Sequence, residues 1–219
     1  MKRDMIIKVC GMREAENIRA VSALDIDMLG MIFWERSPRC VHNVPEFKKT
    51  GNLSNKVMRV GVFVDELPQN IITSVYNYQL DFVQLHGNES RTLIENLRRT
   101  LDPDIKPGIK IIKAISVEKP SDIERCRDYA GAVDMFLFDT KTPLAGGSGR
   151  QFDWTVLQGY DGDVPFLLGG GIGPEDAERV KNFSHPRFAG IDLNSRFETE
   201  PGVKDVEELK TFIQSVRDE

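Results

Sequence analysis

Short runs of apolar and β-branched residues alternate with longer amphipathic segments along the chain. The apolar runs predict eight strands, which begin near Met5, Asp27, Val57, Asp81, Ile109, Val133, Val164 and Arg187. Several of these runs are apolar at consecutive positions rather than at alternate ones, which is typical of strands buried on both faces. The pattern therefore predicts a largely parallel sheet that is covered by helices.

The segments between the strands carry apolar residues at helical spacing. Helices are predicted over residues 14–24, over residues 90–101 with the first residue as the N-cap, and over residues 205–216. Pro174 fits the first position of a further helix, where its missing N–H costs nothing. The weakest helix signal lies at residues 45–49.

Eight strands and about eight helices in 219 residues suit a small (β/α)8 barrel, the TIM barrel, with eight parallel strands inside an outer ring of helices. A doubly wound open sheet is the alternative architecture. The strand count and the glycine-rich turns late in the chain favour the barrel. No linker or composition break interrupts the pattern, so we expect residues 1–219 to form a single domain.

Composition narrows the range of functions. The chain has 29 basic and 34 acidic residues and a net charge of −5, which argues against binding to nucleic acid or to an anionic membrane. The longest apolar stretch, residues 28–34, is far shorter than the ~20 residues needed to cross a bilayer. Lys8 interrupts the first apolar run, so no signal peptide is predicted. We expect a cytoplasmic protein that acts on a small molecule, as a monomer or, alternatively, a dimer.

The three cysteines cannot form a paired disulfide framework, and the three histidines are too scattered to indicate a zinc site. No metal site is predicted.

Functional side chains of a barrel gather where strands end. Cys10 ends the first predicted strand and Asp139 ends the sixth, although a strand cysteine is often a core residue and such an aspartate is often a turn former. The three glycines at 169–171 precede a helix that begins at Pro174. They leave backbone N–H groups open to an anion, which predicts a phosphate site. A second glycine-rich loop, residues 146–150, predicts a lid or substrate clamp.

Two arginines, Arg36 and Arg39, flank a Ser-Pro pair after the second strand. Such arginines are usually solvated, but a guanidinium is suited to a carboxylate through paired hydrogen bonds. His86 closes the fourth strand, and we interpret it as a structural hydrogen-bonding residue rather than a general base.

Eight short segments lie in order across almost the whole chain, and nearly all of them contain a predicted strand end. They are IKVCG at 7–11, LGMIFWERSPR at 29–39, VGVFV at 60–64, VQLHG at 83–87, LFDTKTP at 137–143, GGSGRQFDW at 146–154, GGGIGPE at 169–175 and PGVKD at 201–205. In combination they resemble the phosphoribosylanthranilate isomerase family of tryptophan biosynthesis.

The resemblance implies an Amadori rearrangement of N-(5′-phosphoribosyl)anthranilate into the corresponding 1-deoxyribulose 5-phosphate, without a cofactor. By position it implies that Cys10 is the general base and that Asp139 is the general acid. The substrate would be held by Arg39 at the anthranilate carboxylate and by the backbone of two loops at the phosphate. The implied substrate-binding residues are Arg39, Gly170, Gly171, Asp192, Asn194 and Ser195.

Two other functions compete with this one. The related isomerase of histidine biosynthesis performs the same rearrangement on a substrate with two phosphates, but an aspartate is expected where Cys10 stands. A catalytically silent phosphometabolite-binding barrel would need neither Cys10 nor Asp139. Arg196 stands where the resembling family usually has glycine, so it is either strained, if its φ is positive, or an added cation near the phosphate.

Overall fold

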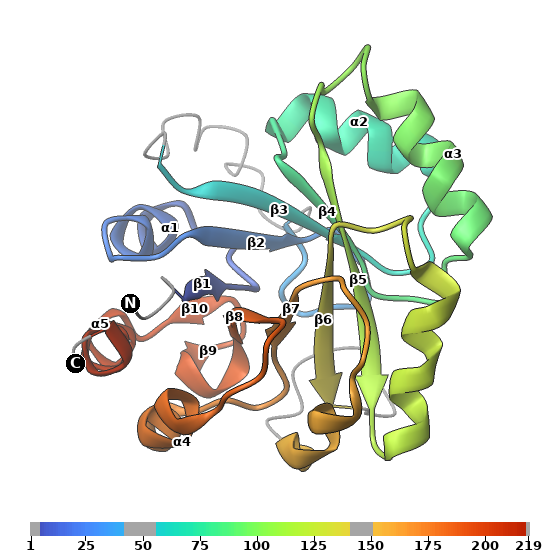
Figure 1. The fold of residues 1–219 in the computed structure, drawn as a ribbon. Coiled ribbons are helices and arrows are strands. Elements are labelled where there is room, and N and C mark those ends of the chain that lie inside the picture. Colours follow the sequence, from blue (N-terminus) through green and yellow to red (C-terminus); the bar gives the residue numbers. More distant parts are fainter. Residues whose placement is uncertain (1–4, 42–55, 141–150, 218–219) are drawn as a thin grey trace.

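The computed structural model describes residues 5–41, 56–140 and 151–217. Eight parallel strands form a closed barrel in sequence order, and the last strand pairs with the first (Figure 1). The strands are β1 (Ile6–Val9), β2 (Met28–Ile32), β3 (Met58–Phe63), β4 (Phe82–Leu85), β5 (Lys110–Val117), β6 (Met135–Thr140), β7 (Phe166–Leu168) and β8 (Phe188–Leu193). The predicted (β/α)8 barrel is confirmed, and each strand begins one or two residues after its predicted start.

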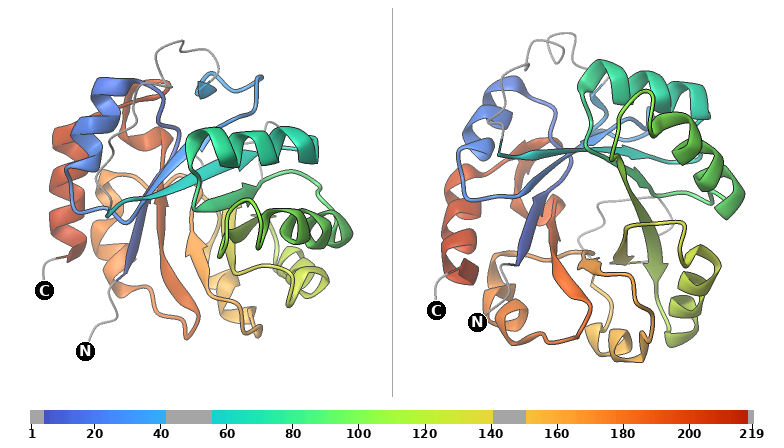
Figure 2. Two further views of the ribbon diagram at one scale, coloured as in Figure 1. Left: turned by 90° about the horizontal axis from the view of Figure 1, so that it is seen from above. Right: turned by 45° about the horizontal axis from the view of Figure 1, so that its top comes forward.

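The helices lie outside the strands, with α1 beside α5 (Figure 2). The α-helices are α1 (Ala15–Ser22), α2 (Pro68–Tyr78), α3 (Arg91–Leu101), α4 (Ala177–Asn182) and α5 (Val206–Arg217). The connections after β5 and β6 contain 3₁₀ turns instead, and a short hairpin follows β8. These elements are η3 (Pro120–Tyr129), η4 (Trp154–Gly159), η5 (Pro174–Asp176), η6 (Ser195–Phe197), β9 (Glu198–Glu200) and β10 (Val203–Lys204).

The helix starts follow local chemistry. Ser90 caps α3, because its side-chain oxygen accepts a hydrogen bond from the N–H of Leu93 at 3.2 Å. Pro174 does open a helical turn, but that turn is the 3₁₀ element η5, and α4 begins only at Ala177. The predicted helix at residues 45–49 lies outside the described residues.

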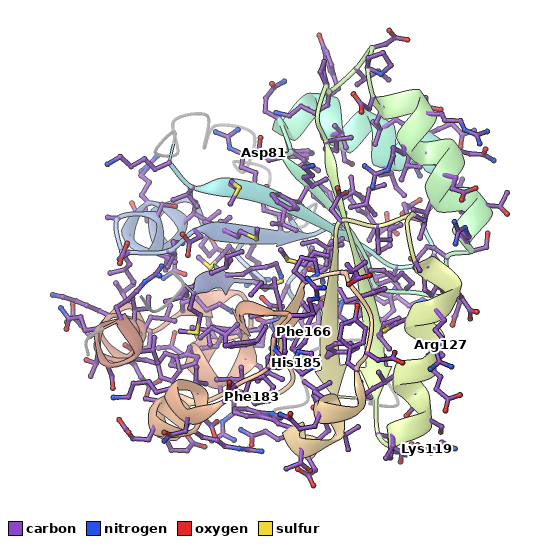
Figure 3. All side chains as sticks on the ribbon, in the orientation of Figure 1. Asp81, Lys119, Arg127, Phe166, Phe183 and His185 are labelled. Atoms are coloured by element: carbon purple, nitrogen blue, oxygen red, sulfur yellow. The ribbon has the colours of Figure 1, made fainter. Side chains whose placement is uncertain are left out.

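Two apolar layers hold the barrel together. The smaller one fills the inside of the barrel, and the larger one lies between the strands and the helices. The buried residues of the inner layer are Met28, Val60, Phe82, Ile112, Ala114, Met135, Leu137 and Leu167. In the outer layer Phe166, Phe183 and His185 gather between β7 and α4 (Figure 3).

Three aspartates repeat one arrangement at the amino ends of β2, β4 and β6. The carboxylates of Asp27, Asp81 and Asp134 accept hydrogen bonds from backbone N–H groups of the preceding strands at 2.7, 2.9 and 2.8 Å. The N–H of each aspartate bonds back to the carbonyl of the same neighbour at 2.9 Å. Each aspartate therefore fixes the register between two strands at this end of the barrel.

No helix among the described residues is long and apolar enough to span a membrane.

Candidate active site

Alternate residues of β1 and β8 face the inside of the barrel, so Lys8, Cys10, Asp192 and Asn194 lie at its carboxyl end. Cys10 is buried with its side chain against β2. A Cβ atom on Gly30 would lie only 2.6 Å from the Cys10 sulfur, so the thiol occupies space that any side chain at Gly30 would fill. The glycine of β2 thus lets the thiol sit at the barrel end.

A buried ion pair lies directly below this thiol. The ammonium of Lys8 donates a hydrogen bond to Asp192 Oδ1 at 2.8 Å, and the Lys8 side chain is fully buried. Burial raises the pKa of the Cys10 thiol, while Lys8 and Lys204 act to lower it and Asp192 raises it further. Burial by itself would lower the pKa of Lys8, but Asp192 and Cys10 raise it. Lys8 therefore stays charged, and its charge is the largest influence that lowers the pKa of the Cys10 thiol.

Asp139 is held from two sides at the end of β6. Its Oδ1 accepts the N–H of Thr140 at 2.8 Å, and its Oδ2 lies 3.1 Å from Nε2 of His86. The amide nitrogen of Gln84 lies 3.0 Å from the other ring nitrogen, Nδ1. With the Gln84 amide in this orientation, Nδ1 accepts and Nε2 carries the proton that points at Asp139. His86 is thus a hydrogen-bonding partner of Asp139, a contact that the sequence analysis did not name.

The glycine-rich turn after β7 packs against this carboxylate. Gly170 and Gly171 have φ values of +83° and +74°, which side chains rarely adopt. A Cβ atom on Gly170 would collide with Thr140 and would lie 3.1 Å from Asp139 Oδ1. Glycine is therefore required for the turn to approach Asp139 so closely.

The turn after β8 faces this glycine turn. Asn194 precedes η6, whose first residue is Ser195, and N–H groups in the first turn of a helix have no acceptor within that helix. Arg196 lies in η6 and is not among the residues with positive φ, so an arginine at this position causes no backbone strain. Its guanidinium instead donates to Glu175 Oε1, which links the two turns at 2.5 Å.

Arg39 reaches the same end of the barrel from the loop after β2. Its Nε and Nη2 donate to the carboxylate of Glu198 at 2.9 and 2.6 Å. Lys204 donates to Glu198 Oε1 at 2.6 Å and to Asn194 Oδ1 at 2.8 Å. Arg36, in contrast, is exposed to solvent.

A second buried pair supports the loop after β4. The ammonium of Lys113 donates to Glu89 Oε2 at 3.1 Å and to the carbonyl oxygens of Leu85 and Gly87. The Glu89 carboxylate in turn accepts the N–H groups of Asp65 and Gly87 at 3.0 Å. This pair holds the strand end from which His86 projects.

The structure thus places Cys10, Arg39, Asp139, Gly170, Gly171, Asp192, Asn194 and Ser195 at one end of the barrel. The predicted clamp loop at residues 146–150 lies outside the described residues. Among residues 5–41, 56–140 and 151–217, no group of three or more histidine, cysteine or acidic side chains is arranged to hold a metal ion.

A family model described as N-(5′-phosphoribosyl)anthranilate isomerase matches residues 7–215. The chain belongs to this isomerase family. The N-(5′-phosphoribosyl)anthranilate isomerase of Parabacteroides distasonis is 51% identical over 213 residues, which cover 97% of this chain and 93% of the relative. The family predicted from the sequence motifs is therefore confirmed.

Solved structures of the isomerase family agree with this assignment. Phosphoribosyl anthranilate isomerase of Thermotoga maritima superposes with a TM-score of 0.83 at 32% identity, over 97% of this chain and 98% of that one. Another structure of phosphoribosyl anthranilate isomerase has reduced 1-(o-carboxyphenylamino)-1-deoxyribulose 5-phosphate bound. It superposes with a TM-score of 0.80 at 30% identity, again over 97% and 98%.

Three charged residues of this isomerase-family site are absent from the sequence-based predictions. Lys8 could have been found, because a lysine in the apolar run IIKVC faces the same side as Cys10, two residues later. The sequence did not indicate that Glu198 and Lys204 pair with each other, since Lys204 appears there only within the motif PGVKD at 201–205 and Glu198 lies in the loop after the eighth strand. Only the pairing of β9 with β10 brings them together.

Proposed function

We propose that this chain converts N-(5′-phosphoribosyl)anthranilate into 1-(2-carboxyphenylamino)-1-deoxyribulose 5-phosphate, with Asp139 as the general acid and Cys10 as the general base. Arg39 binds the ring carboxylate. The backbone of the turns at Gly170-Gly171 and Asn194-Ser195 binds the phosphate.

The reaction proceeds in three proton transfers. Asp139 gives its proton to the furanose ring oxygen, the bond from that oxygen to C1 breaks, and the nitrogen lone pair forms an iminium. The Cys10 thiolate then removes the proton from C2, and the released electron pair forms the C1–C2 double bond and returns the iminium electrons to nitrogen. Transfer of a proton from the C2 hydroxyl to C1 completes the ketone, and proton exchange with solvent returns Cys10 to the thiolate and Asp139 to the acid. Each step needs only proton carriers at fixed positions.

One observation carries the proposal, namely that a thiol and a carboxylate from different strands border the two neighbouring turns after β7 and β8. Gly170 packs against Asp139, and Gly11, which follows Cys10, packs against Asn194 and Arg39. A substrate anchored by its phosphate at these turns would thus have an acid and a base at the edges of the same site. Positioning of this kind is a large part of catalysis.

Two side chains support the catalytic pair. The Lys8 ammonium favours the thiolate of Cys10 against the effect of burial. His86 fixes the rotamer of Asp139 through the contact of its Nε2 with Oδ2 at 3.1 Å. Asp192 binds Lys8 and lines the site next to Cys10.

Asp139→Asn tests the proposal. The amide keeps the size of the side chain but cannot deliver a proton, so kcat should fall by about 10²- to 10⁴-fold while phosphate-ligand binding is retained. The assay follows the change in anthranilate fluorescence with enzymatically generated substrate. Wild-type turnover would show that Asp139 only accepts the Thr140 and His86 hydrogen bonds, and Asp192 would then be the next candidate acid. A cytoplasmic location and a monomeric state stay predictions.

A further inference from the structure

A buried charge cluster, made of Arg39, Glu198 and Lys204, lies beside the turn after β8, where Lys204 contacts Asn194. The Lys204 side chain is 0% exposed, that of Glu198 is 4% exposed and that of Arg39 is 10% exposed. Burying a charge is costly unless it is paired, so these three side chains depend on one another. The cluster contains neither the acid nor the base, although the charge of Lys204 also acts to lower the pKa of the Cys10 thiol.

The hairpin after β8 builds this cluster. Glu198 begins β9, Lys204 ends β10, and the two residues are direct cross-strand neighbours. The N–H of Gly202, in the turn of the hairpin, also donates to Glu198 Oε1 at 3.1 Å. The carboxylate is therefore fixed by the backbone and by Lys204 before it contacts Arg39.

Glu198 binds a defined edge of the Arg39 guanidinium. It accepts from Nε and from Nη2, which lie along one side of the planar group. Within the described residues, Nη1 has no hydrogen-bond partner. A guanidinium has two edges that match a carboxylate, so the edge formed by Nη1 and the second N–H of Nη2 is left for a ligand.

The charges of the cluster favour an anion at that edge. Arg39 and Lys204 contribute two positive charges and Glu198 one negative charge. Burial raises the pKa of the Glu198 carboxyl, but the hydrogen bonds from Arg39 and the charge of Lys204 lower it overall, so Glu198 is ionised at neutral pH. Burial lowers the pKa of Lys204, and Glu198 opposes that shift. With Lys204 balancing Glu198, the charge of Arg39 is left to pair with one ligand carboxylate.

We propose that Glu198 and Lys204 are the positioning pair that makes this isomerase selective for an arylamine with a ring carboxylate. Glu198 holds Arg39 so that one guanidinium edge faces the site, and Lys204 cancels the charge of Glu198. This inference rests on the proposed role of Arg39 as the carboxylate anchor. It adds a specificity role for the β9–β10 hairpin, which contains neither the acid nor the base.

Two matched ligands and the Glu198→Gln variant test this role. The ligands are the reduced product with a 2-carboxyanilino group and the same molecule with a plain anilino group, and their inhibition constants are measured as competitive inhibitors. The amide cannot accept both Arg39 hydrogen bonds, so Arg39 loses its orientation. We expect Glu198→Gln to bind the carboxylated ligand at least about tenfold more weakly, with KM rising in parallel, and to bind the anilino ligand as the wild type does.

Glu198→Asp covers the case in which the glutamine variant does not fold. It keeps the counter-charge for Arg39 and Lys204 but withdraws the carboxylate by one methylene, so we expect a smaller loss in the same direction. Glu89→Gln is the matched control, because it removes the charge of another buried glutamate that is paired with a buried lysine. It should lower thermal stability without changing the ratio of the two inhibition constants.

The possible results distinguish failure of the positioning role of Glu198 from failure of the anchoring role of Arg39. A wild-type ratio of inhibition constants in both Glu198 variants would overturn the positioning role. Tighter binding of the carboxylated ligand in Glu198→Gln would also overturn it, since Glu198 would then compete with the ligand for Arg39. If the wild-type enzyme itself bound both ligands equally, Arg39 would not be the carboxylate anchor, and the proposed function of Arg39 would fail instead.

Discussion

The two ends of the barrel use charged residues in opposite ways. At the amino end, Asp27, Asp81 and Asp134 each bind the backbone of a neighbouring strand and a basic side chain near the surface. At the carboxyl end, charged side chains such as Lys8 and Lys204 are fully buried and bind mainly other side chains. Charged side chains at the amino end fix the strands to one another, and charged side chains at the carboxyl end form the candidate site.

The difference between the two ends follows from the hydrogen-bonding capacity that each arrangement leaves unused. An aspartate that accepts a hydrogen bond from a backbone N–H and pairs with a basic side chain has its main hydrogen-bonding needs satisfied. Such an aspartate fixes the register of the strands and stabilises the fold. The carboxyl-end groups keep unused capacity, as with the thiol of Cys10 and the free edge of Arg39. Burying such groups costs stability, because ion pairs in the interior seldom repay their full desolvation cost. Variants at the two ends should therefore have opposite effects on activity and stability.

The largest effect is expected for Cys10→Ser at the carboxyl end. A hydroxyl is a far weaker base than a thiol, so kcat should fall by about 10²- to 10⁴-fold. The unfolding temperature should change little, since the two side chains are similar in size. Steady-state kinetics and a thermal melt check this prediction. If Cys10→Ser kept the wild-type kcat, the cysteine would be a core residue only.

Arg39→Ala should affect binding rather than turnover. Loss of a charge-assisted pair with the ring carboxylate costs about 1.5–3 kcal/mol, which corresponds to a rise in KM of roughly 10- to 150-fold. Arg36→Ala is the matched control, because Arg36 lies on the same loop but is exposed. A larger rise in KM for Arg36→Ala than for Arg39→Ala would place the carboxylate elsewhere.

At the amino end, Asp134→Ala should reduce stability and leave kcat unchanged. The variant leaves the N–H of Ile111 without its side-chain acceptor and removes the carboxylate partner of the Arg98 guanidinium, so the free energy of unfolding should fall by about 1–3 kcal/mol. Urea denaturation measures the change. Asp163→Ala is the control, since Asp163 pairs with Arg187 in solvent and should contribute little. A loss of kcat without a loss of stability would contradict the proposed division between the two ends.

The contribution of Asp134 should also depend on pH in a known direction. Burial raises the pKa of Asp134, but its hydrogen bonds with Arg98 and Ile111 lower it overall. A carboxyl whose pKa is lower in the folded state stabilises the fold above its ordinary pKa of about 3.9 and loses this contribution as the pH falls through the folded-state value. The stability difference between wild type and Asp134→Ala should be constant from about pH 7 to 5 and shrink below about pH 4.

The smallest effect is expected for Arg196→Gly, which introduces the residue that the motif resemblance leads us to expect at this position. The ion pair between Arg196 and Glu175 is exposed and should contribute at most about 1 kcal/mol. Because Arg196 has a negative φ, glycine relieves no strain. The inhibition constant for inorganic phosphate should rise by less than about fivefold. A larger rise would show that Arg196 leaves Glu175 and binds the phosphate directly.

Local patterns were sufficient to predict the strands and the catalytic candidates. Consecutive apolar residues marked each strand, and Cys10 and Asp139 stood out because each ends such a run. The family was also predictable, since eight short motifs kept their order. The 3₁₀ turns after β5 and β6 were not predicted, because their residues carry apolar positions that fit an α-helix as well.

The sequence by itself thus determined the barrel, the family and the strand ends at which the chemistry is expected, because each of these depends on residues close together in the chain. The tertiary structure alone decided which charges meet. Arg39 and Glu198 are 159 residues apart, and Lys8 and Asp192 are 184 residues apart. Such pairs form only when β8 pairs with β1 and the barrel is closed. The residues near a buried charge in the sequence therefore do not predict which distant residue it will pair with.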